Sequence, residues 1–284
     1  MSALINGAAT DQLFLSDRAI HYGDGLFETI AIRAGRLEFW QRHMRRLNRG
    51  CERLGITPNS ELLLSEARHL INTEDGVLKI IISRGEGGRG YRPPSMEESR
   101  PTRILACYSR PGYPAENSEQ GIALRYCTTP TSLNPALAGM KHLNRLEQVL
   151  ARAEWSDPAI AEGLMFDRDG HVIEGTMSNL FFVCDGTLHT PDLSNSGVAG
   201  IIREVILELA TDMNIPVQCR YYACQDIERA DELFVTNSVI GLWPVRQIQA
   251  RQVGAHGWGI GAVTQQLLTA LDGKRQQKGE YESV

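Results

Sequence analysis

The chain has 284 residues, of which 42% are hydrophobic and 22% charged, values that are typical of a globular protein and exclude disordered and fibrous classes. Its formal net charge of −5 argues against a nucleic-acid or anionic-membrane partner, because both attract strongly basic proteins. A small-molecule substrate is the expected partner. The start of the chain has neither a basic segment nor an apolar run of signal-peptide length, and no stretch approaches the roughly 18 apolar residues of a membrane span. We therefore expect a cytoplasmic protein.

The cysteine and histidine patterns favour neither disulfides nor a metal. The seven histidines form no HExxH motif or other close grouping, so no metal site is expected. No two cysteines form a CxxC pair, which in a chain of this length predicts reduced, mostly buried thiols. The six cysteines are Cys51, Cys107, Cys127, Cys184, Cys219 and Cys224.

Strand and helix signals alternate through the first part of the chain. Hydrophobic periodicity predicts strands within residues 3–7, 25–40, 77–85 and 100–110, and helices within 42–55 and 60–73. In the first helix Met44, Leu47, Cys51 and Leu54 recur every three or four residues, which predicts one buried face beside an arginine-rich remainder. These elements indicate an α/β (α+β) fold.

Residues 111–121 are rich in Pro, Gly and polar side chains and mark the expected boundary between two domains. The prediction is an N-terminal domain at 1–115, a linker at 116–121 and a C-terminal domain at 122–284. In the second domain we expect a strand at 121–129, a meander of three or four strands within 163–191, a helix at 197–214 and a buried strand within 231–245. Hairpin turns are expected in the meander at Asp169-Gly170 and Asp185-Gly186. The inward face of the helix is expected to consist of Ile202, Val205, Ile206 and Leu209. The polar tail 272–284 is expected to be frayed.

The stretch 139–150, GMKHLNRLEQVL, predicts an amphipathic helix, because its leucines recur at helical spacing after Lys141. The preceding segment holds Asn134-Pro135 and Gly139, which break regular structure and predict a loop. Lys141 is therefore expected at a loop-to-helix junction.

Lys141 is the first candidate for chemistry. Removal of an ammonium group from water costs free energy and lowers the pKa of the amine, which makes it nucleophilic. Such a lysine can form a Schiff base with a carbonyl cofactor such as pyridoxal 5′-phosphate and shuttle protons when released. From the residues alone, a solvated lysine in a first helical turn remains the alternative.

Two other features suit that cofactor. Its pyridine nitrogen acts as an electron sink when a carboxylate keeps it protonated, and Glu174 is a carboxylate at the end of an apolar strand, where an unpaired charge is disfavoured. Its phosphate needs N–H groups or an arginine, and Gly200 precedes a helix in which the N–H groups of Ile201 and Ile202 can face an anion. An outward-facing glutamate and an ordinary turn glycine remain the alternatives.

The order of five motifs resembles that of the fold-type IV pyridoxal-phosphate enzymes, which include branched-chain aminotransferases, D-amino acid aminotransferases and aminodeoxychorismate lyases. The motifs are HYGDGLFE, SRGEGGRGY, KHLNRLEQV, VIEGTMSNLFF and GVAGIIRE. The resemblance covers nearly the whole chain. Within the group, KHLNRLEQ together with ISRGEGGRGY is most similar to the lyases, since D-amino acid aminotransferases tend to carry KSLN. The resemblance implies a two-domain fold with a smaller N-terminal α/β domain and a larger C-terminal pseudo-barrel domain.

The resemblance also implies roles for individual residues. Lys141 matches the Schiff-base lysine, which also acts as the catalytic base, and Glu174 matches the carboxylate that faces the pyridine nitrogen. Arg46 matches the arginine that holds the phosphate. The other four arginines between residues 42 and 53 are expected to be solvated.

The remaining phosphate contacts implied by the resemblance come from the backbone. Ile201 and Ile202 match one pair of contacts, and Ser238 and Val239, in the TNSV segment, match another. Related aminotransferases often carry a threonine hydroxyl where Val239 stands, so only the N–H group of Val239 is expected to help.

Substrate contacts follow from the resemblance as well. Arg89 and Tyr91 match positions where relatives bind a substrate carboxylate, and a planar guanidinium suits a bidentate contact with it. Thr29 falls near the substrate face and is expected to protonate the departing enolpyruvyl group. A mobile loop for Arg89 and an ordinary strand position for Thr29 are the alternatives.

The function implied by the resemblance is that of a pyridoxal-phosphate-dependent lyase. It would convert 4-amino-4-deoxychorismate to 4-aminobenzoate and pyruvate in folate biosynthesis. One alternative is an aminotransferase for D-amino or branched-chain amino acids, which needs Lys141 and Glu174 equally, and another is a non-catalytic protein that has kept the fold. The family further implies a homodimer and a functional coupling to an aminodeoxychorismate synthase.

Overall fold

The computed structural model describes residues 2–72, 74–249 and 255–283, and the chain divides into two compact units. Unit 1 comprises Met1–Gly112, Met140–Asn144 and Arg275–Val284, and unit 2 comprises Tyr113–Gly139 and Arg145–Lys274. The boundaries expected from the sequence assign residues 140–144 and 275–284 to the second domain, whereas their contacts lie in unit 1. The ends of the predicted helix 60–73 and of the predicted tail, Thr73 and Val284, lie outside the described residues.

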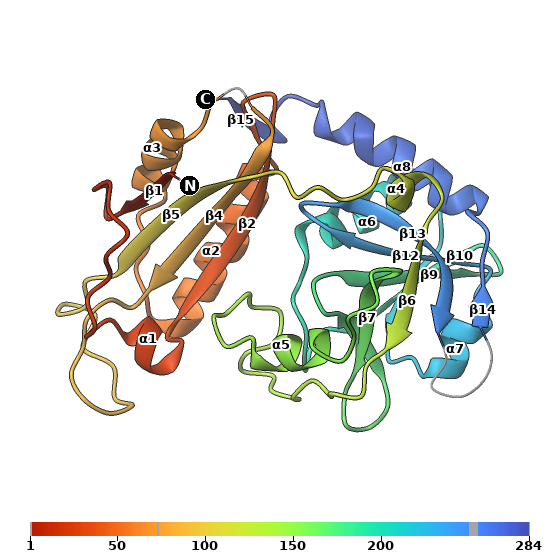
Figure 1. Cartoon of the computed structure of the whole chain (residues 1–284), viewed down its shortest axis with the longest axis horizontal. Coiled ribbons are helices and arrows are strands. Elements are labelled where there is room, and N and C mark those ends of the chain that lie inside the picture. Colours follow the sequence, from red (N-terminus) through yellow and green to blue (C-terminus); the bar gives the residue numbers. More distant parts are fainter. Residues whose placement is uncertain (1, 73, 250–254, 284) are drawn as a thin grey trace. The chain divides into compact units, whose positions relative to one another are not determined.

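Unit 1 is built on a six-stranded antiparallel sheet with the order β1-β5-β4-β2-β3-β15 (Figure 1). Its strands are β1 (Ser2–Ile5), β2 (Gly25–Arg33), β3 (Arg36–Glu38), β4 (Gly76–Ser83), β5 (Thr102–Ser109) and β15 (Tyr281–Ser283). Its helices are α1 (Arg18–Tyr22), α2 (Trp40–Leu54) and α3 (Ser60–Leu70). The predicted elements of this region are confirmed, and the segment 25–40 holds two strands joined by a tight turn at Ala34-Gly35, where both φ angles are positive.

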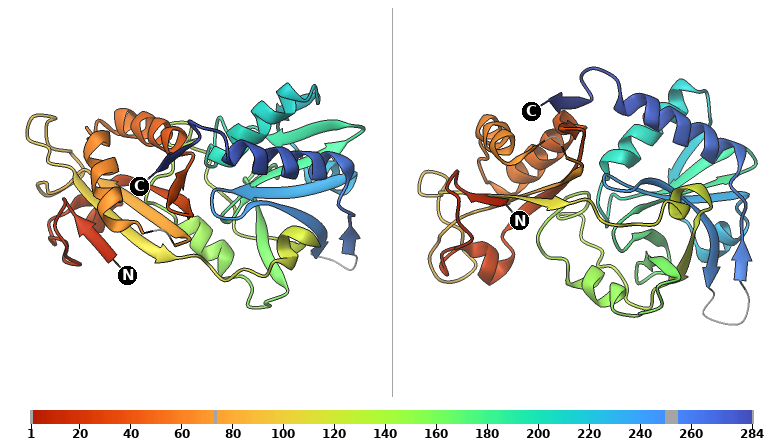
Figure 2. Two further views of the ribbon diagram at one scale, coloured as in Figure 1. Left: turned by 90° about the horizontal axis from the view of Figure 1, so that it is seen from above. Right: turned by 45° about the horizontal axis from the view of Figure 1, so that its top comes forward.

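Helices α2 and α3 cover one face of this sheet, α2 against β2 and α3 against β1 and β5 (Figure 2). Side chains of a strand alternate between the two faces. Leu26 and Glu28 of β2 face α2, and a Cβ on Gly50 of that helix would lie only 2.9 Å from Leu26. Phe27 and Thr29 consequently face the other side of the sheet. The predicted stripe of α2 is confirmed for Met44, Leu47 and Cys51, which are at most 4% exposed, whereas Leu54 at the end of the helix is only partly buried.

The C-terminal tail is ordered, so the prediction of a frayed end is wrong. β15 pairs with β3, and the N–H of Phe39 donates to the carbonyl of Glu280. The carboxylate of Glu280 accepts two hydrogen bonds from Arg42, from Nε at 2.9 Å and from Nη2 at 2.7 Å. Arg42 is buried, so the solvated position expected for it is also wrong. A bidentate ion pair and an edge strand order a segment whose polar composition alone suggests disorder.

Unit 2 is built on a nine-stranded sheet with the order β11-β10-β9-β12-β13-β6-β7-β8, in which β14 also pairs with β13. Its strands are β6 (Ile122–Tyr126), β7 (Ile160–Phe166), β8 (Val172–Gly175), β9 (Asn179–Cys184), β10 (Thr187–Pro191), β11 (Val217–Arg220), β12 (Glu232–Asn237), β13 (Gly241–Gln249) and β14 (Ala255–Gly257). Its helices are α4 (Glu116–Glu119), α5 (Leu146–Arg152), α6 (Ile201–Asp212), α7 (Cys224–Glu228) and α8 (Ala262–Arg275). Because β8 at one end of the order contacts β9 and β10, the sheet curls back on itself.

Residues 163–191 form two hairpins rather than the predicted single meander. β7 pairs with β8 and β9 pairs with β10, but the next neighbour of β9 is β12. Both predicted turns are confirmed, since Gly170 and Gly186 have positive φ. The chain changes direction between the hairpins at a turn in which the N–H of Gly175 donates to the carbonyl of Ser178 at 2.7 Å. A turn signal in the sequence does not tell which strand the next one will join.

The helix predicted after Lys141 is wrong in its start and in its buried face. α5 begins at Leu146, and its apolar side chains Leu146, Val149 and Leu150 are 76%, 59% and 60% exposed. The leucine spacing is that of an amphipathic helix, but the apolar stripe faces solvent within this chain. By contrast, the predicted core face of α6 is confirmed.

The structure also bears on the expectations for the cysteines and for membrane-spanning segments. The six cysteines are free, and of these only Cys51 and Cys127 are buried, so the prediction of mostly buried thiols is wrong for the other four. In the described part of the chain, no helix combines the length and the apolar character needed to cross a membrane.

Candidate active site

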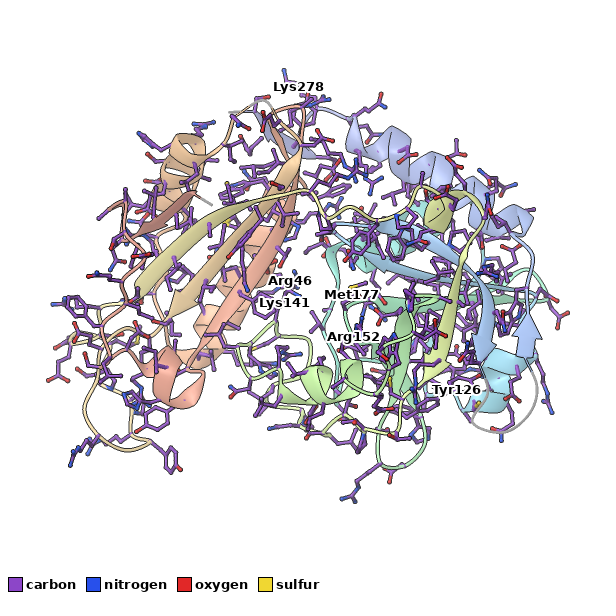
Figure 3. The ribbon with its side chains drawn as sticks, in the orientation of Figure 1. Arg46, Tyr126, Lys141, Arg152, Met177 and Lys278 are labelled. Atoms are coloured by element: carbon purple, nitrogen blue, oxygen red, sulfur yellow. The ribbon has the colours of Figure 1, made fainter. Side chains whose placement is uncertain are left out.

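Lys141 lies in an extended segment that lines the edge of β2. The carbonyl of Lys141 accepts a hydrogen bond from the N–H of Phe27 at 2.9 Å, and the N–H of Leu143 donates to the carbonyl of Gly25 at 3.0 Å. The Nζ atom of Lys141 lies 4.4 Å from the centroid of the Phe27 ring. Strand pairing, rather than a helix start, therefore holds the amine over an aromatic face. Lys141 is half-buried and is labelled together with Arg46 on unit 1 in Figure 3.

Thr29 and Lys79 lie on the same face of the sheet as Phe27. Thr29 follows Phe27 by two residues on β2, and its partner across the strand pair is Lys79 of β4. The Nζ atom of Lys79 lies 5.5 Å from the centroid of the Phe27 ring. The amines of Lys141 and Lys79 therefore both lie near the Phe27 ring, and Thr29 lies on the same face of the sheet as that ring. Lys79 is not among the residues expected from the sequence, although a lysine inside the apolar run VLKIIIS is a signal that could have found it.

Arg46 lies on the opposite face of β2, in a buried cluster with Glu28 and His43. Its Nε and Nη2 donate to Oε1 and Oε2 of Glu28 at 2.8 and 2.5 Å, and Nδ1 of His43 lies 2.6 Å from Oε2 of Glu28. Glu28 is 1% and His43 0% exposed. The cluster itself was not expected from the sequence, because a glutamate in a strand and a histidine in a helix give no local sign that they will meet.

The charges in this cluster offset the cost of its burial. Burial raises the pKa of Glu28, but the charges and hydrogen bonds of Arg46 and His43 outweigh it and lower that pKa to about 2. Burial lowers the pKa of His43, and the positive charges of Arg46 and Lys141 act in the same direction against Glu28. Because an ionised carboxylate only accepts hydrogen bonds, Nδ1 of His43 is the donor to Oε2 of Glu28. Its Nε2 atom is buried and has no hydrogen-bond partner among the described residues.

Glu174, in unit 2, is the third of the four residues of strand β8 and is 4% exposed. Its Oε2 accepts a hydrogen bond from the N–H of Val198 at 2.8 Å. Burial lowers the pKa of Arg145 and of Arg203, and the negative charge of Glu174 acts on both in the opposite direction. The outward-facing alternative for this glutamate is therefore wrong.

The segment that binds Glu174 runs directly into helix α6. Gly200 is the N-cap of α6, and no side chain caps this end. A Cβ on Gly200 would lie 1.9 Å from Oδ1 of Asn179, so a side chain at this position would force Asn179 to move. The structure therefore brings Glu174 together with Ile201 and Ile202, whose N–H groups lie in a helical first turn that has no intrahelical acceptor for them.

The same segment is linked to the lysine through the chain. The N–H of Gly139 donates to the carbonyl of Gly197 at 2.9 Å, and the N–H of Ala199 donates back to the carbonyl of Gly139 at 3.1 Å. Lys141 follows Gly139 by two residues. The loop expected before the lysine is thus tied to the residues that precede α6.

Ser238 and Val239 lie in the turn between β12 and β13. The N–H of Val239 donates to Oδ1 of Asn237 at 2.8 Å, as does the N–H of Ile240 at 2.9 Å. In this structure the turn itself therefore uses the N–H group that was expected to contact a phosphate. The hydroxyl of Thr236, one residue before this turn, is buried without a hydrogen-bond partner among the described residues.

Arg89 and Tyr91 lie on the loop between β4 and β5 and are exposed, Tyr91 by 87%. The backbone of this loop is held by the buried Arg18 of α1, whose Nη1 and Nη2 donate to the carbonyls of Gly90 and Tyr91 at 3.0 and 3.2 Å. The N–H of Gly90 donates to the hydroxyl of Tyr22 at 3.1 Å. These contacts place the loop beside α1, whereas Lys141 lies beside β2.

Several known proteins are similar to this chain in sequence and fold. The family model of amino-transferase class IV matches residues 25–248. The chain is 38% identical to the aminodeoxychorismate lyase of Vibrio harveyi over 270 residues, 94% of this chain and 98% of that protein. It is 30% identical to the branched-chain-amino-acid aminotransferase of Escherichia coli K12 over 280 residues, 92% of this chain and 87% of that protein.

A solved structure gives the same result. The 4-amino-4-deoxychorismate lyase from Pseudomonas aeruginosa superposes with a TM-score of 0.88 at 44% identity, covering 95% of this chain and 98% of that one. The family and the fold class predicted from the motifs are therefore confirmed. The chain belongs to the amino-transferase class IV family.

Proposed function

We propose that this protein is a pyridoxal-phosphate-dependent lyase that converts 4-amino-4-deoxychorismate to 4-aminobenzoate and pyruvate. Its similarity to the lyases of Vibrio harveyi and Pseudomonas aeruginosa covers nearly the whole chain and exceeds its similarity to the Escherichia coli aminotransferase. The observation that carries the proposal is the placement of Lys141, with its amine over Phe27 on the sheet face that also bears Thr29 and Lys79.

The described residues fit the cofactor. Lys141 supplies a half-buried amine, Glu174 a buried carboxylate and Arg46 a buried guanidinium. Helix α6 offers an uncapped N-terminus at Gly200, a position where a side chain would clash, and such helix ends bind phosphate. When bound, pyridoxal phosphate withdraws electrons from the substrate carbon that bears the amine.

Lys141 and Glu174 provide the proton chemistry in this proposal. Lys141 holds the cofactor covalently, and its released amine takes the proton from the substrate carbon that bears nitrogen. The carboxylate of Glu174 holds the proton on the pyridine nitrogen. Arg46 and the N–H groups of Ile201 and Ile202 hold the phosphate.

The turn at Ser238 and Val239 has a smaller part in this arrangement. Because the N–H of Val239 already donates to Asn237, we assign the turn to shaping the phosphate site, with Ser238 as its polar contact.

The substrate groups are assigned to the face of the unit 1 sheet that bears Phe27 and to the loop after β4. The hydroxyl of Thr29 donates a proton to the enolpyruvyl group as its carbon–oxygen bond breaks, so that the group leaves as pyruvate and the ring becomes aromatic. Lys79, the strand partner of Thr29, binds one substrate carboxylate, and Arg89 with Tyr91 binds the other.

The proposal includes the setting of the reaction. By resemblance to its family, we assign the protein to folate biosynthesis, as a homodimer in the cytoplasm that receives its substrate from an aminodeoxychorismate synthase. Analytical ultracentrifugation tests the dimer, and a change in the transit time of the intermediate when both enzymes are mixed tests the coupling.

The second candidate function is transfer of an amino group from D-amino or branched-chain amino acids. It is favoured by the 30% identity to the Escherichia coli aminotransferase, and it needs the same lysine and carboxylate. The two reactions differ in one requirement, because an aminotransferase needs a keto acid to accept the amino group and the lyase does not.

That difference defines the experiment. Aminodeoxychorismate is generated in place without any keto acid, and 4-aminobenzoate is followed by its fluorescence together with pyruvate. The lyase gives the two products in equal amounts, and Lys141→Ala gives neither while remaining folded. Conversion of leucine or D-alanine only when 2-oxoglutarate is added would replace the proposal with the aminotransferase. A protein that shows no visible absorption band, even after incubation with pyridoxal phosphate, would point to the non-catalytic alternative.

A further inference from the structure

We infer that Glu28 is a positioning residue that fixes the guanidinium of Arg46 for the cofactor phosphate, and that His43 fixes Glu28 in turn. The inference rests on the proposed role of Arg46. It assigns Glu28 and His43 to the residues that hold the cofactor, although neither lies on the sheet face of Phe27, over which the Lys141 amine lies.

The geometry of the cluster leaves the guanidinium little freedom. Both carboxylate oxygens of Glu28 accept a bond from Arg46, through Nε and Nη2, so the plane of the guanidinium is set as well as its position. Oε2 of Glu28 also takes the bond from Nδ1 of His43 at 2.6 Å. All three side chains are at most 7% exposed, so water does not compete for these bonds.

Strand β2 connects this cluster to the reactive amine. Phe27 and Glu28 are neighbours on the strand and therefore point to opposite faces. Phe27 supports the Lys141 amine on one face, and Glu28 holds Arg46 on the other. A single rigid strand thus sets the position of the lysine and of the arginine, which a cofactor bound by its two ends requires.

Stability alone is a weak reason for such a cluster. A buried ion pair contributes little net stability compared with apolar residues of the same volume, because both charges lose their hydration. A guanidinium that is already ordered, however, binds a phosphate without the further loss of side-chain entropy that a mobile one would suffer. Positioning therefore explains the pair better than stability does.

Unit 1 contains a matched control for this argument. Glu66 of α3 and Arg103 of β5 form another bidentate pair, with Nη2 of Arg103 2.6 Å from Oε1 of Glu66 and Nε of Arg103 3.2 Å from Oε2. Glu66 is 8% exposed. This pair joins a helix to the same sheet but has no part in the proposed cofactor site.

The test compares two forms of the cofactor on the full-length protein, stripped of cofactor and then reloaded. Pyridoxal lacks the phosphate, so the ratio of the pyridoxal to the pyridoxal phosphate dissociation constants measures the contribution of the phosphate alone. Glu28→Asp keeps the charge but withdraws the carboxylate by one methylene. We expect it to weaken the binding of pyridoxal phosphate about 10- to 100-fold, the range for a charge-assisted hydrogen bond, and to leave the binding of pyridoxal unchanged.

Three further single variants and one double variant complete the test. Arg46→Lys should lower the ratio similarly, and Glu28→Asp should cause no further loss of the ratio in that background. His43→Asn should lower the ratio by a smaller factor than Glu28→Asp, and it carries the test should Glu28→Asp fail to fold. Glu66→Asp should lower the thermal midpoint but leave the ratio as it is in the wild type.

The outcomes that overturn the inference are distinct from those that overturn the proposed function. If Glu28→Asp weakens the binding of both ligands equally, or changes the binding of neither, Glu28 is a structural residue only. If Arg46→Lys leaves the ratio unchanged, the phosphate role of Arg46 fails and the inference fails with it. If the wild-type protein binds neither ligand, the proposed cofactor itself is wrong.

Discussion

The Nζ atom of Lys141 lies 4.4 Å from the centroid of the Phe27 ring, and a 2.9 Å hydrogen bond joins the backbones of the same two residues. Phe27 therefore fixes both ends of the lysine, its carbonyl through strand pairing and its amine through the ring face. This arrangement restricts a long, flexible side chain to one region of the sheet.

Replacement of the ring tests this relationship. Phe27→Leu keeps an apolar side chain of strand character but removes the aromatic face under the amine. Because a cation–π contact contributes about 0.5–2 kcal/mol, kcat should fall roughly 3- to 30-fold. Cofactor affinity should stay at the wild-type value, because the ring is not assigned a cofactor contact. An unchanged kcat would mean that strand pairing alone positions the amine.

Lys79 is assigned to a substrate carboxylate, and its removal should affect the substrate rather than the cofactor. Lys79→Met keeps the length of the side chain without its charge, and kcat/KM should fall about 10- to 100-fold as one charge-assisted contact is lost. Lys79→Arg should retain most of the activity. The absorption spectrum of the bound cofactor is the control, and a loss of cofactor from Lys79→Met would place this lysine in the cofactor site instead.

The sequence predicted most of the helices and strands, but few of the segments with which they pair or pack. Hydrophobic periodicity is local, so it located β2, β4, α2 and α6, whose apolar faces are buried in their own unit. It failed at α5, where the same spacing occurs on a face that is exposed within the chain. It also failed at β15, because the Glu280–Arg42 pair joins residues from the two ends of the chain.

The candidate site shows the same division. The motifs located Lys141, Glu174 and Gly200, because each has a chemical reason to stand where it does. They did not locate Lys79 or His43, since strand register and helix orientation decide what these side chains meet. The long-range pairing of β4 with β2 is what turns a lysine in an apolar run into a neighbour of Thr29.

The buried carboxylate of Glu28 should shape the acid stability of the protein. Its pKa is lowered from 4.5 to about 2 in the folded state, so the stability that it contributes is present above about pH 4.5 and is lost as the pH falls toward 2. The loss should be on the order of 3 kcal/mol in the free energy of unfolding. Urea unfolding at several pH values should show this decline in the wild type and a flatter curve for Glu28→Gln.

Other acids titrate in the same window but do not confuse the comparison. The pKa values of Asp24 and Glu154 are also lowered, Asp24 by its arginine partners and Glu154 by backbone N–H groups, against the raising effect of burial. Both contribute to the wild-type and the variant curves alike, so the difference between the curves isolates Glu28. Parallel curves would show that Glu28 does not gain its stability from ionisation.

Glu162 is a buried carboxylate that holds the turn following Glu174. Oε1 accepts bonds from the N–H of Gly163, the N–H of Thr176 and the hydroxyl of Thr176, and Oε2 accepts bonds from the N–H of Met177 and the hydroxyl of Ser178. A Cβ on the intervening glycine at 175 would lie 2.8 Å from this carboxylate, so the carboxylate packs closely against the turn. Figure 3 labels Met177 on this turn.

Glu162→Gln should therefore disturb Glu174 without touching it. The amide would direct N–H groups at donors that need an acceptor, and each buried group left unsatisfied costs about 1–3 kcal/mol. We expect a lower free energy of unfolding and a shifted absorption maximum of the bound cofactor, because the turn that follows Glu174 must move. Glu154→Gln is the control, since Glu154 accepts bonds from the N–H groups of Thr128 and Thr129 elsewhere in unit 2. If both variants lose stability and neither shifts the spectrum, Glu162 supports the fold but not the position of Glu174.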